Sequence, residues 1–226
     1  MVNKSVYLSL QKDFEEKKVS LVAVSKLKSV ADIKELYDIG HKDFGENYVQ
    51  ELVEKAASLP QDIHWHYIGH LQRNKVKYIA SFVHLIHGVD SLKLLQEINK
   101  QAAKNNRVID CLLQVFIADE ETKFGFDSTD LAQFETFYDA NKDSLSNVRI
   151  RGMMGMASFS EDEEKVKQEF KNLKNIFEIH KGSTFLFDKN FNILSMGMSG
   201  DYPLAIAEGS TMVRIGSLIF GRRLFS

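Results

Sequence analysis

The sequence predicts an α/β fold, a single (β/α)8 TIM barrel that spans residues 1–226. Three observations lead to this prediction. Eight short apolar runs rich in β-branched residues occur along the chain, amphipathic stretches separate them, and no Pro/Gly/Ser-rich linker divides the chain. A doubly wound open sheet is the alternative, because periodicity does not distinguish the two architectures. A barrel predicts that functional residues lie at the carboxyl ends of the strands.

The predicted strands are apolar without strict alternation, as expected for a parallel sheet that helices cover. They span residues 20–25, 42–45, 66–69, 83–89, 110–116, 148–153, 192–197 and 211–216. Residues 183–187 could form a ninth strand or lead into the seventh.

The predicted helices place their apolar residues on one face. They span residues 30–40, 47–59, 91–104, 128–140 and 161–180, with a short helix after residue 200. Ser91, Ser128 and Ser160 are the expected N-caps. The acidic run at 161–165 is expected in a first helical turn, where negative charge suits the helix dipole.

The composition excludes several classes of protein. The chain is 44% hydrophobic and 27% charged with a net charge of −2, which argues against a nucleic-acid or membrane surface as partner. The N-terminal residues carry charges throughout, so we expect neither a signal peptide nor an anchor. The single cysteine, Cys111, follows an apolar pattern and is expected in the core. A reducing, cytoplasmic location fits this cysteine usage.

Glycine and serine follow the two last predicted strands. Ser199 and Gly200 lead into a short helix, and Gly216 and Ser217 lead into the closing segment. Glycine lets the backbone approach an anion, and a helix N-terminus presents free N–H groups. Barrel enzymes often bind phosphate with these two loops, so a phosphate site is predicted here. Ordinary turns are the alternative.

The stretch "SLVAVSKLKSV" ends an apolar strand on Lys26, and Lys28 follows. A lysine that points into a barrel mouth is partly desolvated, which favours its neutral, nucleophilic amine. Such an amine forms a Schiff base with an aldehyde, and pyridoxal 5′-phosphate (PLP) is an aldehyde that also carries a phosphate. A solvated lysine at a strand end is the alternative for Lys26 and the interpretation we prefer for Lys28.

Arg214 lies within the last predicted strand, where an apolar residue would be expected. A buried arginine needs an acceptor, and a pyridine nitrogen would serve. Because arginine does not readily release its proton, that nitrogen would stay unprotonated and the cofactor would be a weak electron sink. An ion pair with Glu208 or Asp201 is the alternative.

The stretch "HWHYIGH" contains His64, His66 and His70. On a strand, His64 and His66 would share one face, which is compatible with a metal ion. No cysteine or carboxylate joins them at a recognisable spacing, so no metal site is expected.

Four motifs together resemble the YggS/PROSC family, the pyridoxal phosphate homeostasis proteins: "LVAVSK", "FGENYVQE", "WHYIGHLQRNK" and "SMGMSGDYPLAIAEGSTMVRIGSLIFG". The resemblance runs from about residue 20 to the end. It implies a barrel like the N-terminal domain of alanine racemase, with PLP on Lys26 and not on Lys28. It further implies that Arg214 faces the pyridine nitrogen, that Asn47 lines the ring and that His70 lies near the mouth. The implied phosphate ligands are Ser199, Gly216 and Ser217, with backbone contacts near Met198 and Gly200.

This sequence departs from the family pattern at three positions. Phe116 stands where an asparagine is usual, and Gly88 stands where a serine is usual. Ser217 replaces a common threonine and preserves its hydroxyl. These departures leave Lys26 and the phosphate loops in place. They change side chains that would contact the face of the PLP ring, so the family's contacts there are not carried over.

The resulting expectation is a PLP-binding protein of intracellular PLP homeostasis without robust catalysis. A PLP-dependent amino-acid racemase or lyase is the alternative, and a sugar-phosphate aldolase ranks last. Racemisation needs a base on each face of Cα. The second domain of alanine racemase is not expected here, and nothing places Tyr48 or Tyr202 at Cα. We expect a monomer whose partners are PLP and PLP-dependent apoenzymes.

Overall fold

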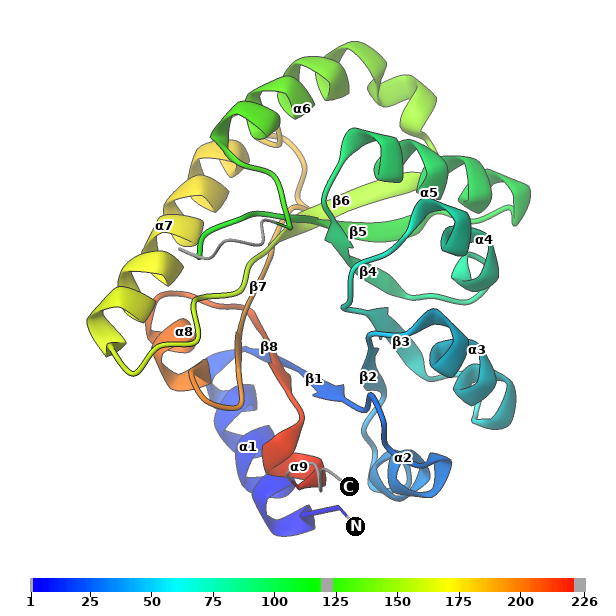
Figure 1. Cartoon of the computed structure of the whole chain (residues 1–226), viewed down its shortest axis with the longest axis vertical. Helices are drawn as coiled ribbons and strands as arrows, with labels where there is room; N and C mark the ends of the chain where they lie inside the picture. Colours follow the sequence, from blue (N-terminus) through cyan, green and yellow to red (C-terminus); the bar gives the residue numbers. More distant parts are fainter. Residues whose placement is uncertain (1, 119–123, 222–226) are drawn as a thin grey trace.

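Eight parallel strands close into a barrel in the computed structural model, which describes residues 2–118 and 124–221. Each strand pairs with its neighbours in chain order, and β8 returns to pair with β1 (Figure 1). Closure confirms the predicted barrel and excludes the open sheet.

The strand ends differ from the predicted ones by at most two residues. The strands are β1 (Ser20–Val24), β2 (Asp43–Glu46), β3 (His64–Tyr67), β4 (Leu85–Val89), β5 (Ile109–Gln114), β6 (Val148–Met154), β7 (Ile193–Met198) and β8 (Met212–Ile215). The possible ninth strand at residues 183–187 is absent, because this segment forms successive turns. The Phe185 ring is buried there and stacks on Phe191 with centroids 4.1 Å apart, which holds the turns against the core.

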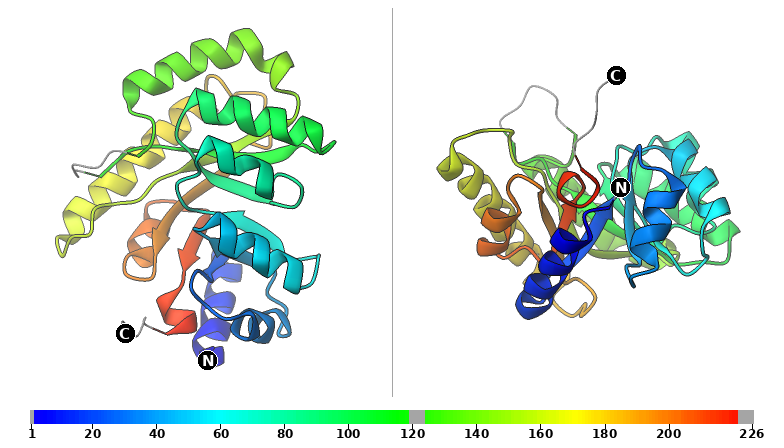
Figure 2. Two further views of the ribbon diagram at one scale, coloured as in Figure 1. Left: turned by 45° about the vertical axis from the view of Figure 1, so that its right-hand side comes forward. Right: turned by 90° about the horizontal axis from the view of Figure 1, so that it is seen from below.

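The helices surround the barrel (Figure 2). They are α1 (Lys4–Lys17), α2 (Val30–Tyr37), α3 (Val49–Ser58), α4 (Val76–Ile79), α5 (Leu92–Lys104), α6 (Ser128–Asn141), α7 (Glu163–Lys181), α8 (Tyr202–Ala207) and α9 (Ser217–Phe220). The sequence reading did not include α1. Within residues 2–118 and 124–221, no helix combines the length and apolar character needed to cross a bilayer.

One of the three predicted N-caps is confirmed and two are wrong. The Ser91 hydroxyl accepts the Leu94 N–H at the start of α5. Asp127, not Ser128, caps α6, and its carboxylate accepts two backbone N–H groups in a capping box. Asp162, not Ser160, caps α7, and its Oδ1 likewise accepts two backbone N–H groups. A carboxylate oxygen next to each serine takes the cap because its charge also suits the helix dipole.

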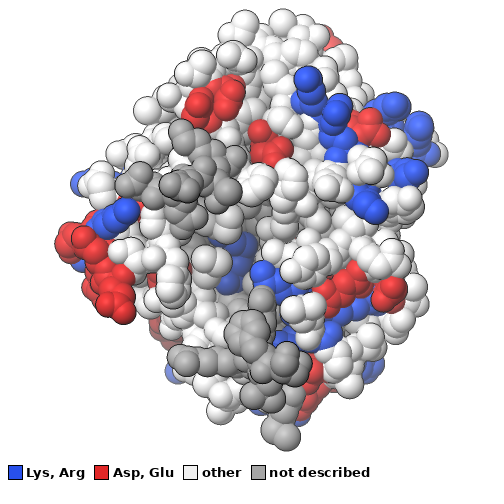
Figure 3. Space-filling view, viewed as in Figure 1, with Lys and Arg blue, Asp and Glu red and all other residues white. Residues whose placement is uncertain are grey.

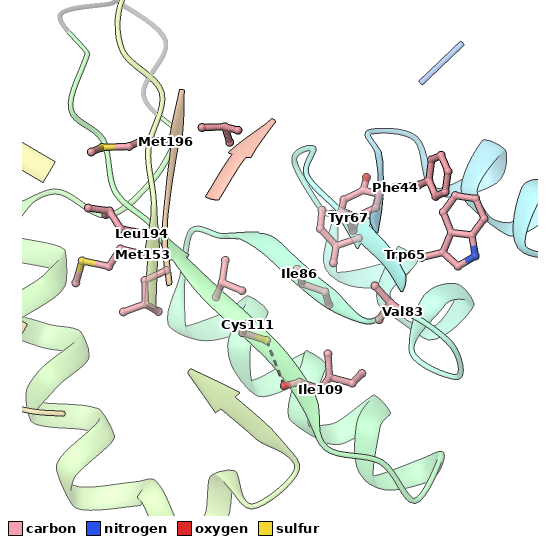
Figure 4. Close-up of a cluster of buried hydrophobic side chains, with 14 of the residues drawn as sticks. Phe44, Trp65, Tyr67, Val83, Ile86, Ile109, Cys111, Met153, Leu194 and Met196 are labelled. Atoms are coloured by element: carbon pink, nitrogen blue, oxygen red, sulfur yellow. Dashed lines mark hydrogen bonds between the residues drawn. The ribbon is translucent and has the colours of Figure 1, made fainter. Parts of the chain in front are cut away.

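The core has two layers. A large apolar cluster lies between the strands and the helices, and Figure 4 shows part of it, including Trp65, Ile86 and Leu194. Cys111 belongs to this layer as a fully buried free thiol, as the sequence predicts. A smaller cluster fills part of the barrel interior and consists of Val22, Leu85, Leu112, Met154 and Met212. Polar side chains complete the interior and lead to the site described next.

Candidate functional site

A cavity of about 350 Å³ opens at the carboxyl ends of the strands. Its volume lies in the range of small-molecule sites, about 300–1,000 Å³. Basic side chains occupy the centre of the corresponding face in Figure 3. Most of the predicted site residues line this cavity. They are Lys26, Asn47, Met198, Ser199, Gly200, Arg214, Gly216 and Ser217. Residues from at least four strand ends therefore meet in one cavity.

Lys26 lies two residues beyond β1, half-buried in the cavity wall. A tight turn presents it, in which the Lys28 N–H donates to the Ser25 carbonyl over 3.0 Å. Leu27 has a φ of 61°, in the left-handed region that few non-glycine residues adopt. The Leu27 N–H donates to Glu51 Oε1 over 2.6 Å. Helix α3 therefore stabilises the strained turn that holds Lys26 at the barrel mouth.

A buried ionic network holds the residue that begins this turn, Ser25. Lys55 Nζ donates to the Ser25 carbonyl over 2.8 Å, to Glu46 Oε1 over 2.7 Å and to Glu51 Oε1 over 2.6 Å. Glu46 is fully buried, and burial raises its pKa although Lys55 and Ser25 act in the opposite direction. The network ties β1, β2 and α3 together immediately before Lys26. The sequence does not reveal it, because Glu46 and Lys55 face Ser25 only after the strands pair, although Glu46, Glu51 and Lys55 lie within ten residues.

Lys28 has a different setting, although it lines the same cavity. Its Nζ donates to the carbonyl of Phe220 over 2.9 Å and to that of Gly221 over 3.3 Å. These carbonyls lie at the end of α9, where a cation suits the helix dipole. Lys28 therefore closes the last helix onto the first loop, and the solvated lysine that the sequence suggested is not what the structure contains.

Arg214 is buried within β8 and points three of its donors at main-chain and hydroxyl oxygens. Its Nη1 donates to the Ser195 carbonyl over 2.8 Å and to Ser195 Oγ over 2.6 Å, and Nη2 donates to the Gly155 carbonyl over 3.0 Å. Burial lowers the pKa of Arg214 to about 10, so the guanidinium keeps its proton at neutral pH. The alternative ion pair with Glu208 or Asp201 does not form among the described residues.

A hydrogen-bonded chain continues from Arg214 through the barrel interior. Ser195 Oγ lies 3.2 Å from His87 Nδ1, and His87 Nε2 lies 2.9 Å from His66 Nδ1. His66 Nε2 lies 3.0 Å from Asp43 Oδ1. Arginine can only donate, and burial lowers the pKa of His87 far below its usual value, so His87 is neutral. A carboxylate only accepts, so the last link of the chain is a hydrogen bond from His66 Nε2 to Asp43 Oδ1.

The loops after β7 and β8 meet at the cavity. Ser199 Oγ accepts the Gly216 N–H over 3.2 Å and joins the two loops. Among the described residues, none accepts the backbone N–H groups of Gly200, Ser217 or Leu218. A Cβ at Gly200 would have no heavy atom within 4 Å, so the space beside this backbone is open. Free N–H groups beside open space are suited to an anion.

Asn47 and His70 lie in different places. Asn47 follows β2 and lines the cavity, and its Oδ1 is buried without a partner among the described residues. An unsatisfied buried acceptor is costly and points to a donor on a ligand. His70 does not line this cavity. It lines a separate one, with Nδ1 2.9 Å from Asp90 Oδ2 and its ring 4.8 Å from that of Phe124.

Sequence reasoning missed several lining residues. Asp201 accepts the Met198 N–H over 2.5 Å, and apolar side chains contribute the rest of the wall. These apolar residues are Val24, Ile68, Met156 and Phe159. Val24 and Ile68 lie within quoted motifs, but an apolar residue gives no sign in the sequence that it faces the cavity, so the fold identifies all four. Phe116, the departure from the family pattern, lines a neighbouring cavity that shares Met156, Phe159 and Met198 with this one.

Comparisons with known proteins agree on one family. The family described as alanine racemase, N-terminal domain, matches residues 7–223. The pyridoxal phosphate homeostasis protein of Aquifex aeolicus (strain VF5) is 40% identical over 211 residues, which cover 91% of this chain and 87% of that protein. The protein of the same name from Escherichia coli (strain K12) is 34% identical over 212 residues, covering 92% and 87%.

Solved structures give the same result. PipY of Synechococcus elongatus PCC7942 without PLP has a TM-score of 0.87 and 33% identity, covering 96% of this chain and 99% of that chain. PipY with PLP bound has a TM-score of 0.84 at the same identity and coverage. Alanine racemase from Bartonella henselae, at 14% identity and a TM-score of 0.67, covers 99% of this chain and 62% of that chain and shares the fold.

Proposed function

This chain belongs to the alanine racemase N-terminal domain family and, within it, to the pyridoxal phosphate homeostasis proteins, and on that premise we propose that it binds PLP reversibly and keeps the free cofactor low. One observation carries the proposal. A half-buried lysine, a buried arginine and two anion-binding loops line the same cavity of about 350 Å³. A phosphorylated pyridine aldehyde has a group for each of them.

The residues present fit PLP. The N–H groups of Gly200, Ser217 and Leu218, which no described residue accepts, would hold the phosphate. Arg214 has two N–H bonds beyond the three directed at Ser195 and Gly155, and they would face the pyridine nitrogen. The buried Asn47 Oδ1 would accept from a donor on the ring.

Lys26 is the residue that would hold the cofactor covalently. When bound, PLP supplies an aldehyde carbon with which a lysine amine forms a reversible bond. Lys26 carries its amine on a turn supported by Glu51 and Lys55, so the backbone is in place before binding. Lys28 lines the same cavity, and its amine donates to the carbonyls of Phe220 and Gly221. We assign the covalent link to Lys26 because the supported turn places it in the cavity wall and because it ends the "LVAVSK" motif.

We propose further that the protein has no robust catalytic activity. The titratable groups among the described residues that line the cavity are Lys26, Lys28, Asp201 and Arg214. Lys28 and Asp201 are used in structural hydrogen bonds, and Arg214 keeps its proton. Racemisation requires a second base opposite the lysine. Tyr48 is exposed outside this lining set, and the Tyr202 ring packs on Phe14.

Reduction with borohydride tests the assignment to Lys26. Protein incubated with PLP, reduced and digested should carry the pyridoxyl label on the peptide that contains Lys26. The matched control is Lys28→Ala, which should keep the label, whereas Lys26→Ala should lose it. A label on Lys28, or labelling that survives Lys26→Ala, would contradict the proposal. Circular dichroism would show that each variant is folded.

Hydrogen exchange separates a carrier from a racemase. Holo-protein incubated with single L-amino acids in deuterated water should show no Cα exchange above that of free PLP, because a ring nitrogen that Arg214 keeps unprotonated would make PLP a weak electron sink. The measurement is loss of the Cα proton signal by NMR. Rapid exchange that depends on Lys26 would support the amino-acid racemase or lyase instead.

The remaining functional assignments are also proposals. We propose that the chain acts as one PLP-binding domain and as a cytoplasmic monomer, and that PLP-dependent apoenzymes receive its cofactor. We also propose that His70 contributes to cofactor binding from the rim of the mouth, where its ring contacts Phe124. Sedimentation velocity would test the monomer, and transfer of PLP to an apoenzyme would test the recipient.

A further inference from the structure

Imidazole and carboxylate groups converge at the amino-terminal end of the barrel, at the opposite ends of the strands from the cavity described above. Asp43 begins β2, His66 lies in β3, and His84 immediately precedes β4. One ligand atom from each lies within 4.8 Å of the other two. The three side chains also line a separate cavity of about 180 Å³. Neighbouring strands bring these residues together across 41 positions of the sequence, from 43 to 84.

We propose that Asp43, His66 and His84 bind one divalent transition-metal ion of the zinc class. Asp43 Oδ1 and His66 Nε2 are 3.0 Å apart. Ligand atoms around a tetrahedral zinc ion with bonds of ~2.0–2.1 Å are about 3.3 Å apart, so this pair needs little adjustment. His84 is exposed, and its ligand atom already lies within 4.8 Å of those of Asp43 and His66, so only a small side-chain adjustment is needed. Three protein ligands leave the fourth position to water.

His87 supplies the outer support that a metal-binding histidine requires. It lies 2.9 Å from His66 Nδ1, so His66 can coordinate through Nε2 and donate from Nδ1 to His87. Coordination through Nε2 would replace the hydrogen bond between His66 Nε2 and Asp43 Oδ1.

His64 holds His84 beside the other ligands. The two rings stack with centroids 4.4 Å apart and an interplanar angle of 19°. His64 Nδ1 also lies 3.2 Å from Asp43 Oδ1. The exposed His84 ring is therefore kept over the cluster.

The surrounding charges select the kind of ion. Arg151 lines the cavity, and Asp110 accepts from Arg151 Nη1 over 2.6 Å and from Arg149 Nε over 2.7 Å. Asp43 and Asp110 together balance the two arginines, so the site has no excess of negative charge. Ca²⁺ and Mg²⁺ favour oxygen-rich, carboxylate sites, whereas imidazoles suit Zn²⁺ and its neighbours. The site therefore takes a nitrogen-preferring ion.

Titration with Co²⁺ tests the site in the intact protein and is independent of PLP binding. Chelator-treated protein should take up one Co²⁺ per chain with visible d–d absorption, and Zn²⁺ should displace it. His84→Ala, an exposed substitution, and Asp43→Asn should each weaken binding at least tenfold. The control His180→Gln should bind Co²⁺ like the wild type, because His180 pairs with Glu135 elsewhere.

Two results would overturn the proposal. Wild-type protein without d–d absorption at millimolar Co²⁺ would show that the cluster does not bind the ion. Equal affinity in the wild type and in His84→Ala would assign the metal to another place. A second readout guards against misfolding: Zn²⁺ should raise the melting temperature of the wild type but not that of the His84→Ala variant.

Discussion

Lys26 and Lys28 are two residues apart, yet the backbone gives them different environments. The left-handed Leu27 between them turns the chain, so that Lys26 stays in the cavity wall while Lys28 reaches the carbonyls of α9. Strain of this kind persists only where surrounding contacts hold it, and Glu51 provides such a contact here. The different environments of the two lysines thus follow from the positive φ of Leu27 and from the hydrogen bond to Glu51 that stabilises it.

A prediction at this scale concerns Arg214. Arg214→Glu should weaken PLP binding at least tenfold, about 1.4 kcal/mol, and should shift the absorption of bound PLP. A glutamate would direct acceptors at the carbonyls of Ser195 and Gly155, which need donors. Absorption titration measures both effects, with Arg73→Glu on the surface as the control. An unchanged spectrum in folded Arg214→Glu would mean that the arginine does not face the ring.

At the scale of elements, the junction of β1, β2 and α3 shows how the barrel supports its mouth. Helix α3 supplies Lys55 and Glu51, β2 supplies Glu46, and Ser25, which follows β1, accepts from Lys55 through its carbonyl. The network is buried, so every missing partner would leave a desolvated charge. The same contacts therefore serve both the stability of the barrel and the placement of Lys26.

Removing the cation of this network should be costly. Lys55→Met should lower the free energy of unfolding by about 3 kcal/mol or more, because Glu46 would stay buried without its partner. Urea denaturation measures the change. The matched control is Lys17→Met, which breaks an exposed pair with Asp13 and should cost within about 0.5 kcal/mol. Equal losses in the two variants would contradict this account.

At the scale of the whole molecule, a polar column runs through the barrel interior beside its apolar cluster. It connects Asp43 at one end of the strands with Arg214 near the other, through His66, His87 and Ser195. Buried polar networks of this kind are tolerated when each member is paired. Burial lowers the pKa of His87 far below its usual value and also lowers that of His41.

Acid should therefore destabilise the fold. Below a pH of about 6.5 the unfolded chain binds protons at these histidines while the native state does not, so stability falls as the pH falls. Each histidine contributes up to ~1.4 kcal/mol per pH unit. Urea unfolding at pH 7.5 and 5.5, with a chelator present, should show the loss. The free energy of unfolding of His87→Gln should fall less between these two pH values than that of the wild type. An equal fall in both proteins would show that His87 does not contribute to the acid sensitivity.

Much of the fold and part of the site could be predicted from local patterns. The eight strands, five helices and both glycine–serine loops are determined by periodicity and composition within short windows, and Lys26 follows from its place at a strand end. The predicted caps at Ser128 and Ser160 are wrong, because an aspartate within two residues of each serine competes for the same position and takes it.

The sequence by itself determined the eight strands, their alternation with helices and the place of Lys26 after the first strand, because each depends on residues close together in the chain. Only the tertiary structure decided that the sheet closes into a barrel and what surrounds these elements. Arg214 finds its oxygens on β7 and beyond β6, and Asp43 meets His84 across neighbouring strands. The physical reason is that burial and pairing depend on contacts between residues far apart in sequence, which no local spacing encodes.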